Sequence, residues 1–154
     1  MDACILNLPT DLAICSAAVS DWRPTINEEK KIKKISKNKY RSNIKTFELT
    51  ENPDILETIS NLNINRPRLV VGFAAETGDL INQATNKLLR KKCDWIVAND
   101  VSPGTYTFGN EENEVTLLYL DEENNIEVDS WPRISKSEVA HRLIKKVAAE
   151  IAIK

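Results

Sequence analysis

Three short apolar runs indicate the interior strands of the chain. Residues 12–19 (LAICSAAV), 68–75 (RLVVGFAA) and 95–98 (WIVA) contain no helical polar face. Continuous apolar runs of this length are typical of strands buried on both faces of a parallel sheet. Residues 44–49 (IKTFEL) predict a further, weaker strand.

Helical patterns alternate with these strands. Asn52, Pro53 and Asp54 offer an N-cap, the preset φ of a first helical position and a negative charge for the positive helix end. They predict a helix to about residue 61. A second helix is predicted over residues 78–92, where apolar residues and lysines recur at three- and four-residue spacing.

The last third of the chain predicts a β-hairpin and a long helix. Residues 114–120 and 125–129 flank the acidic turn 121–124. Ser135 and Glu138 then have the spacing of a capping box. The apolar residues after it recur as one helical stripe, which we expect to pack on the sheet: Val139, Leu143, Ile144, Val147 and Ile151.

Strands that alternate with helices predict a three-layer α/β/α domain, Rossmann-like or ribokinase-like, with a mixed, mainly parallel sheet. Ligands of such domains bind beyond the carboxyl ends of the strands, here residues 17–21, 73–77 and 98–100. The first strand follows at most the tail of a helix over residues 2–8. We therefore expect a single domain, 1–154, that lacks an N-terminal part of its sheet.

Composition excludes several classes of protein. No apolar run approaches the roughly 20 residues that span a bilayer, and no signal peptide opens the chain, so we expect a soluble, cytoplasmic protein without a membrane partner. Three cysteines without a C-x-x-C pair argue against disulfides and zinc ribbons. Four glycines allow neither a P-loop nor a G-x-G-x-x-G motif. The single histidine, His141, is expected on a solvated helix face.

Charge is divided unevenly along the chain. The net charge is −2, but residues 22–45 hold nine basic and two acidic residues, a local charge of +7 that leaves −9 for the rest. This basic window has no apolar period, so we interpret it as a loop or flap. A local cationic field of this kind attracts anionic ligands.

Six segments in order carry a resemblance to a known family. They are AAVSDWRP at 17–24, KIKK at 31–34, NPDIL at 52–56, VGFAAET at 71–77, Lys87-Leu88 with Lys91, and DWIVAND at 94–100. Together they resemble phosphopantothenate-cysteine ligase, the phosphopantothenoylcysteine synthetase of the DNA/pantothenate metabolism flavoprotein family. The chain is similar to the C-terminal part of the synthetase domain of the bifunctional bacterial decarboxylase/synthetase.

The resemblance implies a reaction of coenzyme A biosynthesis. The carboxylate of 4'-phosphopantothenate would attack CTP and release pyrophosphate, and cysteine would then displace CMP from the acyl-cytidylate. Mg²⁺ would accompany CTP, and the protein would form a homodimer. FMN would belong to a flavin-dependent decarboxylase domain that this chain lacks. We expect the chain to be inactive without the missing N-terminal half.

The resemblance also implies roles for individual residues. Lys31 would be catalytic and close over the phosphates, although most lysine runs are solvated loops. Asp21 would contact the nucleotide through metal or ribose, and its other interpretation is a strand-end turn residue. Phe73 would stack on cytosine, or belong to the core. The further nucleotide-binding residues would be Cys15, Ser16, Ala17, Asn52, Pro53, Asp54, Ile55, Lys87 and Lys91.

Two other classes of function remain open from the residues. The basic window, with Trp22 and Tyr40 available to stack on bases, could hold nucleic acid as an arm. The remaining charge of −9 and the lack of a nucleic-acid motif argue against that, and we expect no nucleic-acid partner. The chain could also be a catalytically silent fragment that supplies a dimer interface.

Overall fold

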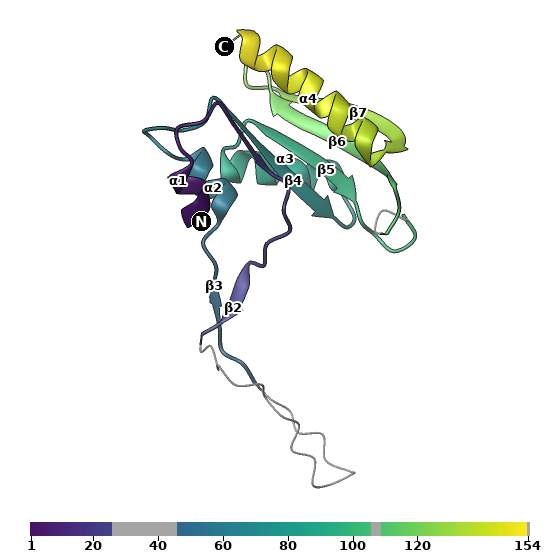
Figure 1. The fold of residues 1–154 in the computed structure, drawn as a ribbon. Coiled ribbons are helices and arrows are strands. Elements are labelled where there is room, and N and C mark those ends of the chain that lie inside the picture. Colours follow the sequence, from purple (N-terminus) through teal and green to yellow (C-terminus); the bar gives the residue numbers. More distant parts are fainter. Residues whose placement is uncertain (26–45, 106–108, 154) are drawn as a thin grey trace, which may run out of the picture. The chain divides into compact units, whose positions relative to one another are not determined.

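A computed structural model describes residues 1–25, 46–105 and 109–153 of the chain (Figure 1). The chain divides into two compact units. The first unit comprises Met1–Ala17 and Ile55–Lys154, and the second comprises Ala18–Asp54. Within the described residues, no helix is both long and apolar enough to cross a membrane.

The first unit is built on a five-stranded sheet with the order β1-β4-β5-β6-β7. The strands β1, β4 and β5 pair in parallel, whereas β5–β6 and β6–β7 pair antiparallel. The predicted mixed sheet with a parallel core is confirmed. The bounds are β1 Leu12–Cys15, β4 Leu69–Glu76, β5 Trp95–Asp100, β6 Glu112–Leu120 and β7 Ile126–Ser135.

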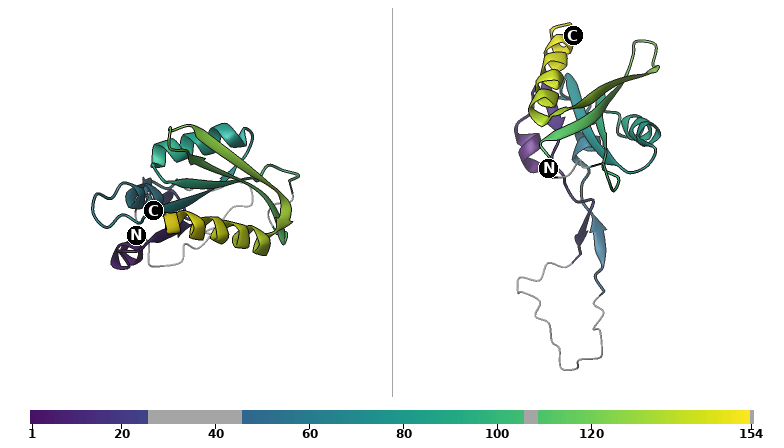
Figure 2. Two further views of the ribbon diagram at one scale, coloured as in Figure 1. Left: turned by 90° about the horizontal axis from the view of Figure 1, so that it is seen from above. Right: turned by 90° about the vertical axis from the view of Figure 1, so that its right-hand side faces the viewer.

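Helices cover both faces of this sheet, which gives the three predicted layers (Figure 2). The helices α2 and α3 bury one apolar cluster against it, and Cys4 of α1 packs on the same cluster. The helix α4 buries a second cluster through Val139, Leu143 and Val147. The bounds are α1 Asp2–Leu6, α2 Ile55–Ser60, α3 Leu80–Lys91 and α4 Lys136–Ile153.

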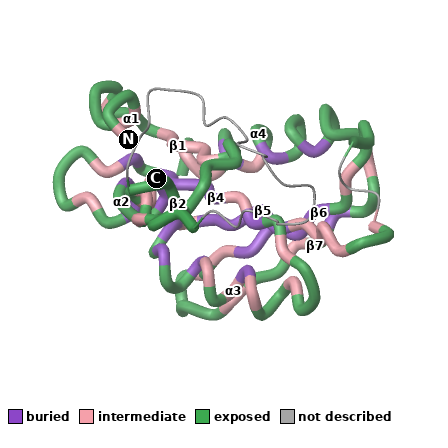
Figure 3. Tube along the Cα trace, turned by 90° about the horizontal axis from the view of Figure 1, so that it is seen from below, coloured by how far each residue is buried: buried purple, intermediate pink, exposed green. Residues whose placement is uncertain are grey.

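The strand β4 lies at the centre of this packing because it is apolar on both faces (Figure 3). Val70 and Ala74 face α2 and α3, while Leu69 and Val71 face α4. Between them, a Cβ atom on Gly72 would lie 2.5 Å from Cδ2 of Leu56 and 2.8 Å from Cδ1 of Ile96. Glycine therefore lets α2 approach the sheet closely.

The first strand is shorter and less buried than predicted. It ends at Cys15, and its four residues are only half-buried, whereas burial on both faces was expected over residues 12–19. Among the described strands, β1 pairs with β4 alone and so forms an edge of the sheet. An edge strand has no second neighbour to cover it, which explains the partial burial.

Helix ends follow local sequence signals closely. The Asp79 side chain caps α3 by accepting the Asn82 N–H at 3.2 Å, and Ser135 Oγ accepts the Glu138 N–H at 3.1 Å before α4. Both predicted starts are confirmed.

Ile144, predicted in the buried stripe of α4, is 51% exposed because it lies beside that stripe. His141 is exposed, as predicted.

The predicted hairpin is confirmed, with a longer second strand than expected. Its turn is held by Asp121, whose Oδ1 accepts the N–H groups of Glu123 at 2.9 Å and Asn125 at 2.8 Å. A hydrogen bond from the Asn125 side chain to Asp121 Oδ2 is the largest cause of the lowered pKa of Asp121, and the backbone bonds add to it.

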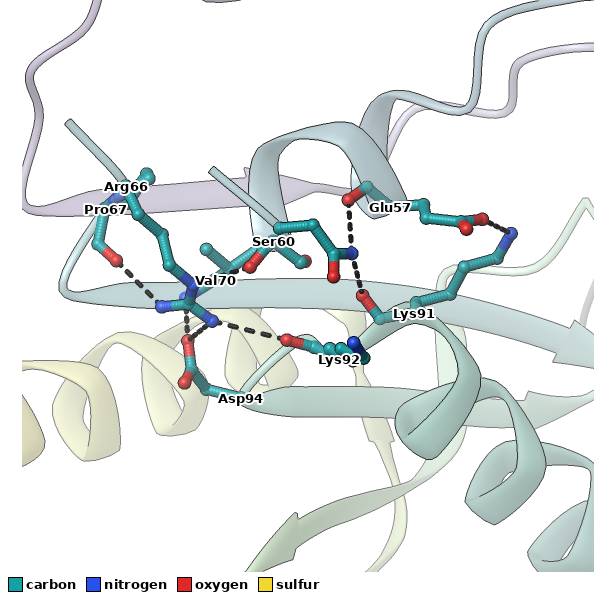
Figure 4. Close-up of polar contacts among 9 residues, drawn as sticks. Glu57, Ser60, Arg66, Pro67, Val70, Lys91, Lys92 and Asp94 are labelled. Atoms are coloured by element: carbon teal, nitrogen blue, oxygen red, sulfur yellow. Dashed lines mark hydrogen bonds and ion pairs between the residues drawn. The ribbon is translucent and has the colours of Figure 1, made fainter. Parts of the chain in front are cut away.

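An arginine-centred network joins α2, β4 and β5 (Figure 4). Arg66 donates to the Ser60 carbonyl at 2.7 Å and pairs with Asp94 Oδ2 at 3.1 Å. The same oxygen of Asp94 accepts the Val70 N–H at 2.6 Å. Sequence reasoning missed this network, because its members contact one another only in the folded chain.

The second unit contains a two-stranded antiparallel ribbon, β2 (Trp22–Pro24) and β3 (Leu49–Glu51). Its register pairs Trp22 with Glu51 and Pro24 with Leu49. The strand predicted over residues 44–49 is wrong in position, because β3 begins only at Leu49. Most of the basic window, residues 26–45, lies outside the described residues.

Candidate functional site

The carboxyl ends of the parallel strands form one edge of the first unit. Cys15 pairs with Gly72, and Glu76 pairs with Asp100, so the segments that follow β1, β4 and β5 lie along the same edge. Ser16 and Ala17 are exposed directly after β1. The strand ends predicted at residues 73–77 and 98–100 are confirmed, whereas β1 ends at Cys15, before the predicted segment 17–21.

The turns after β4 and β5 are tied together by hydrogen bonds. Val101 N–H donates to the Glu76 carbonyl at 2.9 Å, and Gly78 N–H donates to Ser102 Oγ at 3.4 Å. Ser102 N–H donates to Asp100 Oδ1 at 2.7 Å. Ser102 was missed by sequence reasoning, although an Asp two residues before a Ser-Pro-Gly turn is a recognisable local signal.

The Asp100 carboxyl group is acidified by this turn. Hydrogen bonds from Ser102, first its side chain and then its backbone N–H, hold the pKa of Asp100 below its ordinary value. Such bonds favour the charged form. The turn therefore stabilises the ionised form of Asp100.

The edge carries more negative than positive charge. Glu76, Asp79 and Asp100 supply three carboxylates, and Lys87 Nζ lies 3.5 Å from Glu76 Oε1. Within the described ranges, no three His, Cys, Asp or Glu side chains gather closely enough to hold a metal ion. A polyphosphate at this edge would need cations from elsewhere, because like charges repel.

The two predicted lysines of α3 contact different elements. Lys87 pairs with Glu76 of β4, whereas Lys91 is 8% exposed and pairs with Glu57 of α2 at 2.8 Å (Figure 4). A protein carboxylate therefore lies beside each of the two lysines. The structure thus does not bring them together as one anion site.

Phe73 lies on the face of β4 that α4 covers. It is half-buried and packs against the same cluster as Leu69 and Val71. Its ring contributes to the core, which was the alternative interpretation of the sequence.

The buried thiol of Cys93 has low reactivity. The thiol lies in the cluster under α2 and α3, and burial raises its pKa to about 12. A thiol with this pKa is not a nucleophile at neutral pH.

In the second unit, Asn52 joins two motifs that are far apart in sequence. Its backbone N–H donates to the Asp21 carbonyl at 2.8 Å, and its side chain donates to the Ser20 carbonyl at 2.7 Å. Arg23 Nη1 donates to Asn52 Oδ1 at 2.9 Å and to the Glu51 carbonyl at 2.7 Å. We call residues 20–23 and 51–52 the ribbon base. Hydrogen bonds, including one to the Asp21 carbonyl, join its two segments.

The predicted helix cap at Asn52 is wrong. The helix α2 begins at Ile55, three residues later, and the Asn52 amide is used within the ribbon base. Pro53 and Asp54 connect the ribbon to α2, Pro53 exposed and Asp54 half-buried. Arg23 was missed as a site residue, although it stands in the S-D-W-R-P motif.

Lys31 lies outside the described residues, as does the rest of the KIKK motif. The described part of the site is therefore the edge of the first unit and, separately, the ribbon base of the second. Asp21 is exposed in the latter.

Comparison with known proteins agrees with this architecture. The family model of the DNA/pantothenate metabolism flavoprotein C-terminal domain matches residues 1–151. The chain is 41% identical over 117 residues to the coenzyme A biosynthesis bifunctional protein CoaBC of Vibrio cholerae. That alignment covers 76% of this chain, which spans 28% of the length of its relative.

Two solved structures share the fold. The C-terminal domain of a coenzyme A biosynthesis bifunctional protein CoaBC superposes with a TM-score of 0.63 at 30% identity, covering 94% of this chain and 58% of that one. The DNA/pantothenate metabolism flavoprotein from Streptococcus pneumoniae, 20% identical, gives a TM-score of 0.61 over 97% of this chain and 67% of that one. The chain belongs to the DNA/pantothenate metabolism flavoprotein C-terminal domain family.

Proposed function

We propose that this chain is the C-terminal part of a phosphopantothenate-cysteine ligase of coenzyme A biosynthesis. It would join 4'-phosphopantothenate to cysteine at the expense of CTP. The observation that carries the proposal is the family match over residues 1–151, to which the carboxyl-edge segments belong. Relatives that bear the name coenzyme A biosynthesis bifunctional protein support it.

The proposed chemistry brings anions together. The phosphopantothenate carboxylate attacks the α-phosphorus of CTP, pyrophosphate leaves, and the cysteine amine displaces CMP from the acyl-cytidylate. Charge neutralisation and positioning would dominate such a reaction. Because the edge is acidic, we assign the neutralising charge to Lys31 and the basic window around it.

Each unit, taken by itself, offers candidate nucleotide-binding groups. Cys15, Ser16 and Ala17 offer backbone groups at the end of β1, where α/β domains bind ligands. Asp21 and Asn52 would contribute from the ribbon base, whose hydrogen bonds fix the backbone of both. Of the two α3 lysines, Lys87 is the better candidate, since Lys91 is buried against Glu57.

Mg²⁺ is assigned to the proposed reaction as an ion that would arrive with the nucleotide. Mg²⁺ is commonly held by one or two carboxylates together with substrate phosphates, and the described residues form no three-ligand cluster of their own. Exposed Asp21 is the proposed protein ligand. The ion would supply positive charge at the phosphates.

A homodimer is a further part of the proposal. The second unit exposes large apolar side chains, namely Val19, Trp22, Phe47 and Leu49, each more than half exposed. Apolar patches of this kind mark interaction surfaces. Sedimentation of the chain would test it: a dimer that Trp22→Ser converts to monomer supports the ribbon as the interface, and a monomeric parent chain contradicts it.

Thermal denaturation with nucleotides tests the proposed ligand. In the presence of Mg²⁺, CTP should raise the melting temperature more than ATP does. Asp21→Asn should reduce that difference, whereas Asp2→Asn, an exposed carboxylate on α1, should preserve it. Equal shifts by the two nucleotides, or none, would contradict nucleotide selectivity in this chain.

A further inference from the structure

The helix α4 covers the sheet face opposite α2 and α3 (Figure 1), and a groove lies beside it. It consists of two adjoining hollows of about 310 and 190 Å³, which share Lys146 and Ala149. The larger is completed by Trp131, Arg142 and Lys145. The smaller is completed by Trp95, Tyr119, Glu150 and Ile153. We call these two hollows the α4 groove.

The floor of the α4 groove is aromatic. Trp131 and Trp95 are 5% and 6% exposed, so each offers only part of its ring to the hollow above it. Tyr119 lies beside Trp95, with ring centroids 6.1 Å apart. These exposed parts of the rings offer apolar contact, which favours a ligand with an apolar body.

The rim of the larger hollow is basic. Arg142, Lys145 and Lys146 lie three or four residues from Ala149 or from one another, so they share one face of α4. This face adjoins the stripe of Val139, Leu143 and Val147 that packs on the sheet.

Protein carboxylates neutralise only part of this positive charge. Arg142 pairs with Glu138 at 3.2 Å, and Lys146 pairs with Asp129 at 2.9 Å. Lys145 forms no ion pair with any carboxylate in the described part of the chain. The rim therefore retains a cation above an apolar floor, which is complementary to a ligand with one negative charge.

Ala149 is the small residue that lines both hollows, whereas its neighbour Ala148 lines neither. The larger hollow falls at the lower end of the size range of small-molecule sites. A ligand with about two fused rings, and not a folded partner, fits such a space.

We propose that the α4 groove binds a small amphipathic monoanion. Its flat apolar body lies on Trp131 and against Ala149, and its carboxylate or sulfonate pairs with Lys145 and Arg142. The smaller hollow, with Glu150 in its lining, takes apolar parts of a longer ligand. None of the residues assigned to the nucleotide lines this groove, so the inference is independent of the proposed function.

Three probes separate the contribution of the apolar body of the ligand from that of its negative charge. 1-Naphthoate carries both the apolar body and the charge, 1-naphthalenemethanol carries the body alone, and acetate carries the charge alone. Each is titrated into the ¹⁵N-labelled full chain while the indole N–H signals of the three tryptophans are followed. Trp→Phe variants assign the signals.

Naphthoate should shift the Trp131 signal strongly and the Trp95 signal more weakly, in a saturable manner. Trp22, in the other unit, should stay unchanged and serves as the internal control. The neutral alcohol should bind at least tenfold more weakly, and acetate should cause no saturable shift. Absence of saturation with naphthoate, or equal binding of the alcohol, overturns the proposal.

A matched pair of substitutions, at Ala149 and Ala148, tests where naphthoate binds. Ala149→Leu fills the groove and should weaken naphthoate at least tenfold, whereas Ala148→Leu, on the same exposed helix, should leave the affinity within twofold. Lys145→Glu, an exposed change that preserves folding, should weaken it at least fivefold. Equal affinities in the two leucine variants, or an unchanged affinity in Lys145→Glu, would show that naphthoate binds elsewhere.

Discussion

The β4–β5 pair and the β2–β3 ribbon hold their residues by different forces. Val70, Val71 and Ala74 of β4 are fully buried under helices on both faces, whereas all three residues of β2 are exposed. Apolar burial therefore fixes the carboxyl edge, and hydrogen bonds from Asn52 and Arg23 fix the ribbon base. A segment with few buried apolar contacts opens more easily than a packed core.

A matched pair of leucines tests this difference most strongly. Leu88→Ala, in α3, should lower the free energy of unfolding by about 3 kcal/mol, because it leaves a cavity in the core. Leu49→Ala, in the ribbon, should change it by less than about 0.5 kcal/mol, because Leu49 is 54% exposed. Urea denaturation measures both. Similar losses in the two variants would contradict the comparison.

Gly72→Ala should lower the free energy of unfolding somewhat less than Leu88→Ala does. The new methyl group would meet the side chains of Leu56 and Ile96, so overpacking should lower the free energy of unfolding by about 1–3 kcal/mol. Gly104→Ala is the control for space, because nothing lies within 4 Å of a Cβ there, although its φ of +95° adds backbone strain. A Gly72→Ala protein as stable as the parent would mean that α2 does not pack closely on the sheet.

Asn52→Ala should act locally. It removes the hydrogen bonds that join the side chain to Ser20 and Arg23, so local opening of the ribbon should become about 1 kcal/mol easier. Hydrogen exchange at the Asn52 and Thr25 amides, which donate across the ribbon, should accelerate about fivefold. The amides of β4 should exchange as before. Acceleration throughout both units would instead indicate global destabilisation.

The smallest effect concerns the carboxyl edge itself. Ser102→Ala removes the side-chain hydrogen bond that is the largest cause of the lowered pKa of Asp100, so that pKa should rise toward its ordinary value. A carboxyl group with a lowered pKa stabilises the fold above its unfolded-state pKa, and this contribution is lost as pH falls through the lower folded-state pKa. The free energy of unfolding of the variant should therefore change less with pH in the acid range than that of the parent chain. NMR titration of Asp100 gives the pKa, and an unchanged value would contradict the assignment.

The sequence predicts the core better than the ribbon for a physical reason. Burial on both faces leaves a continuous apolar run, so β4 and β5 were placed within a residue or two of their observed starts. The ribbon buries no face, which leaves no period to detect, and the strand expected over residues 44–49 was misplaced. The edge strand β1 was predicted as too long because its run of small residues continues beyond its pairing with β4.

Residues with local contacts were likewise predictable from sequence, and residues with tertiary contacts were not. Asp79 and Ser135 act on the residues that follow them, so their capping roles were predictable. Asn52 was taken for a cap because Asn-Pro-Asp suits a helix start, but its amide is satisfied by Ser20 and Arg23, some 30 residues away in sequence. The Arg66–Asp94 network likewise depends on tertiary contacts that no local pattern records.

The central proposal is that this chain is part of a CTP-dependent ligase. A hybrid protein, in which the chain replaces the matching segment of the Vibrio cholerae relative, allows cysteine-dependent release of CMP to be measured directly. The account predicts turnover with CTP well above that with ATP. Lys31→Ala should reduce it at least about 100-fold, and Lys136→Ala, an exposed lysine of α4, should not. A folded hybrid that releases no CMP, or one that is indifferent to Lys31, would contradict the claim.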